Sequence, residues 1–285
     1  MIQDIAPHKL DNVFHDGRKP AKDSLIFHFA GNELLVRIGE DEVSLPRYEE
    51  LTGAQEESGR QVERFVYLFT LDGIDCFWLR EDEKLSLEGY AYDTLRALRN
   101  RAYGPQHIFF AAYTAMQLVN WYRDNAYCGR CSAKTVHSDQ ERALVCPDCG
   151  RTIYPRIIPA VIVGVTDGDE IVLTKYAGRD VPYFALIAGF TEIGETLEET
   201  VAREVMEEVG LKVKNIRYYK SQPWAMADDI LMGFYCDVDG DKTIRLDRNE
   251  LKEGAWYRRE EIVLQPDSYS LTNEMMRMFK EGKNI

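Results

Sequence analysis

The sequence of 285 residues lacks any long hydrophobic run. No stretch approaches the roughly 20 consecutive apolar residues that a membrane helix needs. The first residues, Met1 to Pro7, lack the basic-then-apolar pattern of a secretory signal. We therefore expect neither a membrane protein nor a secreted one, and we predict a cytoplasmic location.

Basic residues are the minority among the charged ones. Lys and Arg number 35 against 48 Asp and Glu, which gives a formal net charge of −13. This balance disfavours broad electrostatic attraction to nucleic acid, and it suits a protein that gathers divalent cations to meet an anionic substrate. Apolar residues make up 45% of the chain, a fraction typical of folded domains, and the length allows two domains.

Cysteine is also scarce, but four of the six cysteines form a pattern. Cys128-x2-Cys131 and Cys146-x2-Cys149 are separated by fourteen residues, which is typical of a four-thiolate zinc site. The alternative is a pair of disulfides in a secreted protein. Because there is no signal pattern and two cysteines are left over, Cys76 and Cys236, we favour zinc and expect both leftover thiols to be buried. Four thiolates leave no open position, so the zinc is expected to be structural.

The N-terminal part predicts a β-rich domain with a connecting helix over residues 1–124. Short runs of β-branched and aromatic residues predict strands, with a hairpin turn at Asp72-Gly73 and a polar loop at Gln55–Arg60. The expected strands are Ser24–Ala30, Glu33–Ile38, Val62–Leu71 and Ile74–Leu79. An apolar stripe predicts a helix over Pro105–Asn125; its members are Ile108, Ala112, Ala115, Val119 and Tyr122. We expect a supporting or dimerisation role here.

The C-terminal part mixes strands and helices. Ile157–Val165 is almost entirely apolar, as a central strand would be, and we expect its return strand at Ile171–Lys175. Further strands are expected at Ala185–Ala188, Val213–Tyr219, Ile230–Val238 and Ala255–Tyr257, and helices at about Thr196–Val209 and Thr272–Lys280. This order predicts an α/β sandwich, and the whole chain is assigned to the α+β class.

The strongest chemical pattern runs from Gly189 to Leu211. A glycine-bracketed loop leads into a helix on which Glu204, Glu207 and Glu208 share one arc. We expect the neighbouring arc to face the core; it comprises Val201, Ala202, Val205, Met206 and Val209. Three carboxylates on one helix edge repel one another unless a cation lies among them, and oxygen ligands favour Mg²⁺ or Mn²⁺.

This segment resembles the Nudix box, G-x5-E-x7-R-E-U-x-E-E-x-G-U with U aliphatic, at every specified position. The resemblance implies an α/β/α sandwich and hydrolysis of a nucleoside diphosphate linked to another group. It implies that Glu204 and Glu208 are metal ligands, that Glu207 is a further ligand or the base, and that Arg203 braces the carboxylates. Gly189 and Glu195 are assigned to the substrate side of the box.

The chain is also similar to zinc-ribbon NADH pyrophosphatases of the NudC type, in which a four-cysteine ribbon directly precedes the Nudix domain. Tyr154-Pro155-Arg156 and the array Ser221-Gln222-Pro223-Trp224 support this similarity. It implies a ribbon over 125–153, a Nudix domain over 154–285 and a homodimer. The implied substrate-binding residues are Tyr154 and Phe190, which sandwich nicotinamide, and Ser221, Gln222 and Trp224. Glu250 matches the distal metal ligand, with Glu253 as a second candidate.

The array departs from the family after Trp224. Where the family continues Pro-Phe-Pro-x-Ser, this chain has Ala225-Met226-Ala227-Asp228-Asp229.

We expect cleavage of NADH or NAD⁺ to nicotinamide mononucleotide and AMP, with a water activated by Glu207 or Glu208. The alternatives are ADP-ribose, a dinucleoside polyphosphate, or NAD-cap removal from RNA. A different class, a zinc-ribbon nucleic-acid-binding protein with an inert Nudix domain, stays as the remote alternative.

Overall fold

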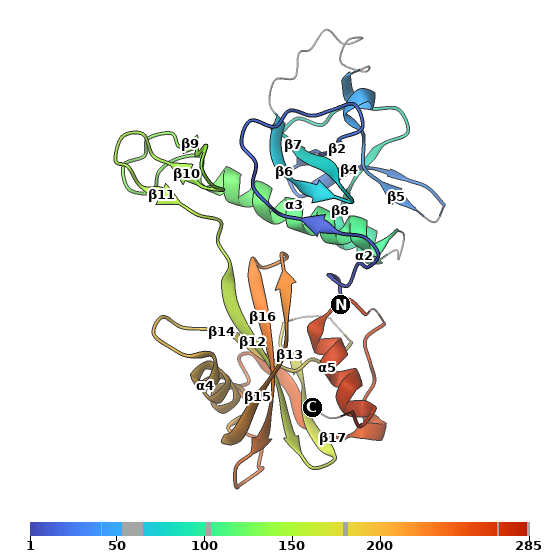
Figure 1. Cartoon of the computed structure of the whole chain (residues 1–285). Helices are drawn as coiled ribbons and strands as arrows, with labels where there is room; N and C mark the ends of the chain where they lie inside the picture. The colour runs from blue at the N-terminus through green and yellow to red at the C-terminus, as the bar shows by residue number, and fades with distance from the viewer. Residues whose placement is uncertain (41, 53–64, 101–103, 179–181, 267, 284–285) are drawn as a thin grey trace. The chain divides into compact units, whose positions relative to one another are not determined.

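The structure is a computed structural model that describes residues 1–40, 42–52, 65–100, 104–178, 182–266 and 268–283 (Figure 1). It divides into two compact units, residues 2–156 and residues 157–285 with Met1. The loop predicted at Gln55–Arg60 and the first three residues of the strand predicted at Val62–Leu71 lie outside the described residues. Among the helices of the described ranges, none has the length and apolarity to cross a membrane.

Residues 2–156 begin with two small sheets. The strand order of the first sheet is β1 (Leu10–Asp11), β6 (Phe65–Leu71), β7 (Ile74–Leu79), β2 (Leu25–Phe27). The strand order of the second sheet is β3 (Phe29–Ala30), β4 (Glu33–Ile38), β5 (Val43–Ser44), and β8 (Ala91–Thr94) also pairs with β4. The strand predicted at Ser24–Ala30 is therefore split at His28. The chain passes from the first sheet to the second at this residue. The His28 side chain is fully buried there, and its ring nitrogen lies 2.7 Å from the Tyr92 hydroxyl.

The predicted hairpin turn and helix are both present. Asp72 and Gly73 have φ of +53° and +78°, the left-handed angles that a tight two-residue hairpin requires. Helix α3 (Gln106–Asp124) buries most of the predicted stripe, with Ile108 only half-buried. A short helix that the sequence analysis missed, α2 (Leu95–Asn100), precedes it. The ribbon follows with β9 (Val136–His137), β10 (Leu144–Val145) and β11 (Thr152–Ile153).

The second unit is built on a mixed sheet. Its strand order is β15 (Val213–Trp224), β16 (Asp229–Val238), β12 (Ile158–Asp167), β13 (Glu170–Tyr176), β17 (Leu251–Arg258), with β14 (Ile187–Phe190) also on β12. Strands β12 and β16 are parallel and lie at the centre. The predicted central strand at Ile157–Val165 is thus confirmed, because an apolar strand can bury both of its faces there.

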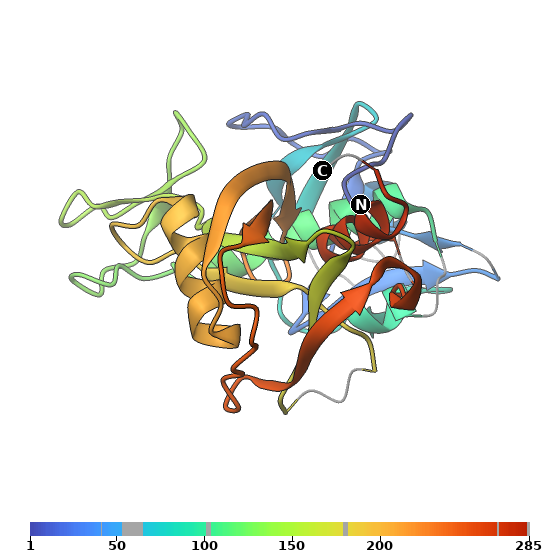
Figure 2. The ribbon, with the colours of Figure 1, turned by 90° about the horizontal axis from the view of Figure 1, so that it is seen from below.

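Two helices cover opposite faces of this sheet (Figures 1 and 2). Val161 and Val163 of β12 pack in the cluster that contains the apolar side of α4 (Leu197–Val209). Ala160 and Ile162, which alternate with them, pack in the cluster that contains α5 (Leu271–Lys280), near the 3-10 turn η1 (Arg259–Glu261). The predicted α/β/α sandwich is confirmed, and α4 is its helix with a carboxylate edge.

Candidate active site

Helix α4 has well-defined ends. Thr196 is the N-cap: its hydroxyl accepts from the Glu199 N–H, and the Glu199 carboxylate accepts from the Thr196 N–H. This reciprocal capping box satisfies two backbone donors at the start of the helix. Gly210 ends the helix in the left-handed conformation, with φ of +70°. The helix is therefore held in register with the loop that precedes it.

One face of α4 is apolar and buried, but it is narrower than predicted. Val201, Val205 and Val209 are fully buried against the sheet. Ala202 and Met206 were expected beside them, and this expectation is wrong: both are exposed, Met206 at 41%. The space beside the valines is taken by Glu204 and Glu208, which are 9% and 1% exposed. The core side of α4 thus contains two carboxylates.

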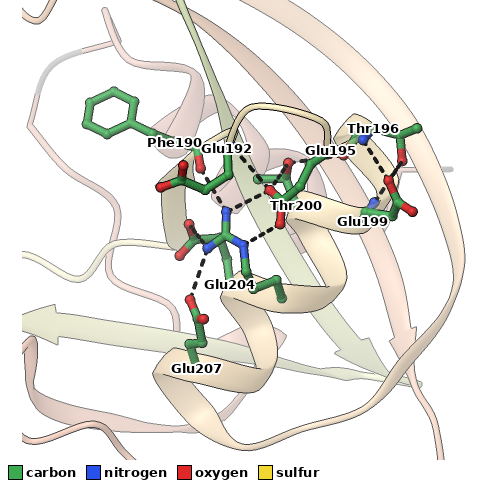
Figure 3. Close-up of polar contacts among 9 residues, drawn as sticks. Phe190, Glu192, Glu195, Thr196, Glu199, Thr200, Glu204 and Glu207 are labelled. Atoms are coloured by element: carbon green, nitrogen blue, oxygen red, sulfur yellow. Dashed lines mark hydrogen bonds and ion pairs between the residues drawn. The ribbon is translucent and has the colours of Figure 1, made fainter.

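The guanidinium of Arg203 donates to three carboxylates. These belong to Glu195, Glu204 and Glu207, which are labelled in Figure 3. The Arg203 Nε and Nη2 donate to the two oxygens of Glu195 at 2.6 and 2.9 Å, in a bidentate pair. Its Nη1 donates to Glu204 at 2.7 Å and to Glu207 at 2.9 Å, and its Nη2 also donates to the Phe190 carbonyl at 2.9 Å. Arg203 therefore connects the loop before α4 to the carboxylate edge of the helix.

This guanidinium affects the carboxylates unequally. Its hydrogen bonds hold the pKa of Glu195 well below the ordinary value, at about 2. Burial outweighs the same guanidinium at Glu204, whose pKa is raised. The Thr200 hydroxyl adds a further bond to Glu195 at 3.0 Å. Glu195 is thus a fixed anion that orients Arg203. At Glu204, in contrast, Arg203 alone does not compensate for burial, so a further positive charge would stabilise the carboxylate.

Gly189 allows strand β14 to lie against Glu204. A Cβ built on Gly189 would lie 2.0 Å from the Glu204 carboxyl carbon. No side chain fits at that distance, so the glycine of the box is required by close approach rather than by its backbone angles. The other bracketing glycine differs, since Gly194 has φ of +100° and faces open space. Glycine is therefore required at the two positions for different reasons, a close approach at Gly189 and a positive φ at Gly194.

Glu208 is the most buried acid of the helix. Burial, together with the nearby carboxylates of Glu204, Glu250 and Asp247, raises its pKa to about 8. One oxygen accepts from the Ala188 N–H at 3.4 Å, and the other is buried without a hydrogen-bond partner. A buried carboxylate oxygen without a partner is costly, and acids nearby increase the cost. These residues fit a divalent cation, which would be bound by the carboxylate oxygens and would give the unpartnered oxygen of Glu208 a partner.

Glu250 reaches this cluster from another element. It lies at the turn before β17, exposed, and close enough to raise the pKa values of both Glu204 and Glu208. Asp247 was not singled out from the sequence; its N–H donates to the Glu208 carbonyl at 2.9 Å, and its carboxylate acts on Glu208. An acid three residues before Glu250 was the available signal. Glu253 instead pairs with Lys175 at 2.9 Å.

The four predicted cysteines converge in the ribbon. The Sγ atoms of Cys128 and Cys149 lie 3.7 Å apart, those of Cys131 and Cys146 lie 3.4 Å apart, and all four lie within 4.8 Å of one another. This matches the tetrahedral four-thiolate site of structural zinc. Cys76 and Cys236 are fully buried elsewhere, as predicted.

The predicted nicotinamide pair is distributed over the two units. Tyr154, at the end of the first unit, is 57% exposed and its hydroxyl donates to Glu141 at 2.8 Å. Phe190, at the end of β14 in the second unit, is 51% exposed. Both rings therefore present an accessible face, and their sandwich stays a prediction.

The array after the box lies at the end of β15. Gln222 is fully buried; its amide donates to the Tyr269 carbonyl and accepts from the Leu271 N–H, each at 2.7 Å, so it supports the start of α5. Ser221 and Trp224 are half-buried. In the departing segment, Asp229 is 6% exposed, has an oxygen without a partner, and its pKa is raised by burial to about 6. The departure thus places a buried acid beside the array.

Comparison with known proteins agrees with this geometry. The NUDIX domain model matches residues 156–279, and the NADH pyrophosphatase zinc ribbon domain model matches residues 123–154. A protein named NAD-capped RNA hydrolase NudC from Erwinia tasmaniensis is 37% identical over 190 residues, which are 67% of this chain and 72% of that protein. Its namesake from Vibrio atlanticus is 34% identical over 216 residues, 75% and 77% of the two chains. The chain therefore belongs to the NudC family of Nudix hydrolases.

Proposed function

We propose that this chain is a divalent-metal-dependent pyrophosphohydrolase that cleaves the diphosphate of NADH or NAD⁺ to nicotinamide mononucleotide and AMP. The observation that carries the proposal is the buried carboxylate of Glu208, with an unpartnered oxygen, beside Glu204 and Glu250. The zinc ribbon directly before the Nudix domain and the family membership support the choice of a nicotinamide dinucleotide.

In this proposal Glu204, Glu208 and Glu250 hold Mg²⁺ or Mn²⁺. When bound, the cation supplies neutralisation of the diphosphate charge, which is the part of the chemistry that no acidic side chain can provide. Arg203 fixes Glu204 and keeps the loop at Phe190 in place through its five donors. The substrate rings are assigned to Phe190 and Tyr154, whose exposed faces suit stacking.

Glu207 is the carboxylate best placed to accept a proton from the attacking water. Its side chain is 59% accessible, whereas that of Glu204 is 11% accessible, and Arg203 holds it at 2.9 Å. The water oxygen forms a bond to one phosphorus while the bond from that phosphorus to the bridging oxygen breaks. The water proton passes to Glu207, and the two monophosphates leave as products.

Product analysis tests this function. The zinc-loaded chain is incubated with Mn²⁺ or Mg²⁺ and, separately, NADH, NAD⁺, ADP-ribose and diadenosine polyphosphate, and the products are identified by mass spectrometry. We expect nicotinamide mononucleotide and AMP from NADH or NAD⁺, and a large loss of rate in Glu207→Gln with the fold intact. If another diphosphate is cut and NADH is not, the proposed pyrophosphohydrolase activity is supported and the proposed substrate is wrong.

NAD-capped RNA is a second candidate substrate, because relatives in the family are named for it. Removal of the cap breaks the same phosphorus–oxygen bond and releases nicotinamide mononucleotide, leaving a 5′-monophosphate on the RNA. The homodimer stays a prediction of the family resemblance, and the cytoplasmic location stays a prediction from the sequence. The inert zinc-ribbon protein is disfavoured by the complete carboxylate edge of α4.

A further inference from the structure

Residues 2–156 contain a pocket of about 320 Å³ that the Nudix chemistry does not use. Five segments converge on it: the chain after β1, the start of β6, the end of β7, α3 and the ribbon strand β9. Its walls include Phe14, Arg18, Tyr67, Arg80, Tyr122 and His137. The volume lies at the lower end of the range for ligand sites, about 300–1,000 Å³. A single nucleotide suits it better than a dinucleotide.

Aromatic rings dominate the walls of this pocket. His137 of the ribbon stacks on Tyr122 of α3, with ring centroids 4.8 Å apart and planes 11° from parallel. His15, which is exposed and also lines the pocket, forms a T-shaped pair with Tyr67, with ring centroids 5.7 Å apart. Tyr67 and Tyr122 are each only 6% exposed, so the exposed rings of His15 and His137 are the surfaces on which a base can stack.

The charges at the pocket are basic, although the chain as a whole is acidic. Arg18 and Arg80 line it against a single acid, Asp16. Arg18 is already paired with Asp75 and lies over the Tyr67 ring at 5.0 Å. Arg80 is exposed and, within the ranges that the structure describes, has no hydrogen-bond or ion-pair partner of its own. Its guanidinium is therefore available for a phosphate.

The ribbon wall of the pocket is fixed to the rest of the unit. Arg142, in the loop between β9 and β10, donates to the Leu68 carbonyl of β6 at 2.6 Å and to the Asn12 carbonyl at 3.3 Å. Its guanidinium also lies 5.9 Å from the Phe14 ring centre. The zinc cluster orders the hairpin that contains His137, and Arg142 ties that hairpin to β6. The pocket thus depends on both.

We propose that this pocket binds one nucleotide of a single-stranded RNA, with the base against the aromatic walls and the phosphate at Arg80. The link to NAD-capped RNA rests on the proposed function, whereas binding of RNA without a cap does not. The zinc would then have two effects, since it orders the ribbon and thereby holds in place the wall that the ribbon contributes to the RNA-binding pocket. Free mononucleotides share this chemistry, and the test below separates them.

Binding is measured first, without catalysis. The zinc-loaded full chain is titrated into a fluorescein-labelled single-stranded RNA that carries no NAD, and anisotropy is followed at several salt concentrations. We expect Arg80→Glu to weaken binding about tenfold and to lower the salt slope by about 1, because one phosphate contact is lost. His15→Ala should weaken binding about fivefold through lost stacking. The matched control is Arg96→Glu, the same charge change on the exposed side of α2.

Catalysis then gives a second readout. In Arg80→Glu, KM for NAD-capped RNA should rise about tenfold with kcat unchanged, while hydrolysis of NADH stays at the wild-type rate. Equal RNA affinities of Arg80→Glu and Arg96→Glu, with zinc content and melting temperature at wild-type values, would overturn the proposal. So would binding of AMP with no binding of RNA. If the wild type cuts neither NADH nor capped RNA, the proposed function fails, and the anisotropy result still decides this inference.

Discussion

The ribbon and the edge of α4 both gather metal-binding side chains, but they do so in opposite ways. In the ribbon the four ligands are chemically alike, and two short knuckles supply all of them. On α4 the acids are unequal: Arg203 lowers the pKa of Glu195 to about 2, and burial raises that of Glu208 to about 8. Four thiolates fill the tetrahedral coordination sphere of zinc, whereas a few carboxylates leave positions of an octahedral cation open for a substrate.

This difference explains what each centre can do. The ribbon has only two-residue strands and few buried apolar side chains, so its order depends on the metal. Helix α4 packs its valine face against the sheet, so its order depends mainly on packing, while the capping box and the C-terminal glycine define its ends. Loss of metal should therefore disorder the ribbon and leave α4 folded.

The largest expected effect comes from breaking the ribbon. Cys146→Ser removes a fully buried ligand, and zinc contributes about 10–16 kcal/mol to folding in small zinc peptides at neutral pH. We expect loss of the bound zinc and proteolytic cleavage within residues 126–153. Atomic emission gives zinc per chain, and limited proteolysis gives the cleavage sites.

The matched control uses a buried cysteine outside the ribbon. Cys236→Ala should keep one zinc per chain and resist cleavage in the ribbon, because Cys236 packs in the valine cluster near α4. Full zinc occupancy of Cys146→Ser, together with an intact ribbon, would show that the order of the ribbon does not depend on its metal.

The second effect concerns the carboxylate edge. Glu204→Gln keeps the shape of the side chain but removes a charge that both Arg203 and the cation need. We expect a fall in kcat/KM for NADH of about 100- to 1,000-fold, the usual loss for one electrostatic group at a reacting centre. Glu198→Gln, an exposed acid in the first turn of the same helix, is the control and should retain activity. Equal rates of the two variants would remove Glu204 from the site.

Features encoded in a short stretch of sequence could be predicted, whereas features that depend on contacts between distant segments could not. The ribbon and the Nudix box are local patterns, so the convergence of the four cysteines and the ends of α4 were predicted closely. The errors at Ala202 and Met206 have one cause: helical periodicity cannot say that Glu204 and Glu208 occupy the space beside the valines. The role of Asp247 and the split at His28 depend on contacts between distant segments, which local patterns do not encode.

The third effect is a pH dependence of the metal-free chain. The pKa of Glu208 is near its ordinary value of 4.5 when the chain is unfolded and about 8 when folded. Folding thus favours its neutral form, and the free energy of unfolding falls by about 4 kcal/mol as the pH rises from about 4.5 to about 8. Glu195 contributes little above pH 5, because with a folded pKa of about 2 it is ionised in the folded chain and mostly ionised in the unfolded chain.

Thermal melting with a chelator that spares the ribbon zinc measures this effect. Between pH 5 and pH 8 the second unit should lose stability in the wild type and much less in Glu208→Gln. Added Mg²⁺ or Mn²⁺ should restore the wild type at pH 8 and leave Glu208→Gln nearly unchanged. A wild-type stability that rises across this window would show that Glu208 is charged in the folded chain.

The fourth effect separates geometry from charge. Gly189→Ala adds a Cβ that meets the Glu204 carboxyl group, so the carboxylate must move although its charge is kept. We expect kcat/KM to fall about 100-fold, since a displacement of about 1 Å at a reacting centre has that cost. Unfolding free energy should fall by about 1–3 kcal/mol through overpacking. Steady-state kinetics and denaturant unfolding measure the two, and unchanged kinetics would mean that Glu204 can move without loss.

The smallest effect tests whether the order of α4 depends on packing and not on its cap. Thr196→Ala removes the hydroxyl that accepts from the Glu199 N–H, which should cost about 1 kcal/mol. Since Arg203 still ties Glu195 to the helix through two hydrogen bonds, NADH hydrolysis should stay within about twofold of the wild type. Denaturant unfolding and kinetics on the same sample separate the two results. A large loss of activity with so small a loss of stability would mean that the cap positions the carboxylates directly, and that the contrast between a metal-ordered ribbon and a packing-ordered helix is too simple.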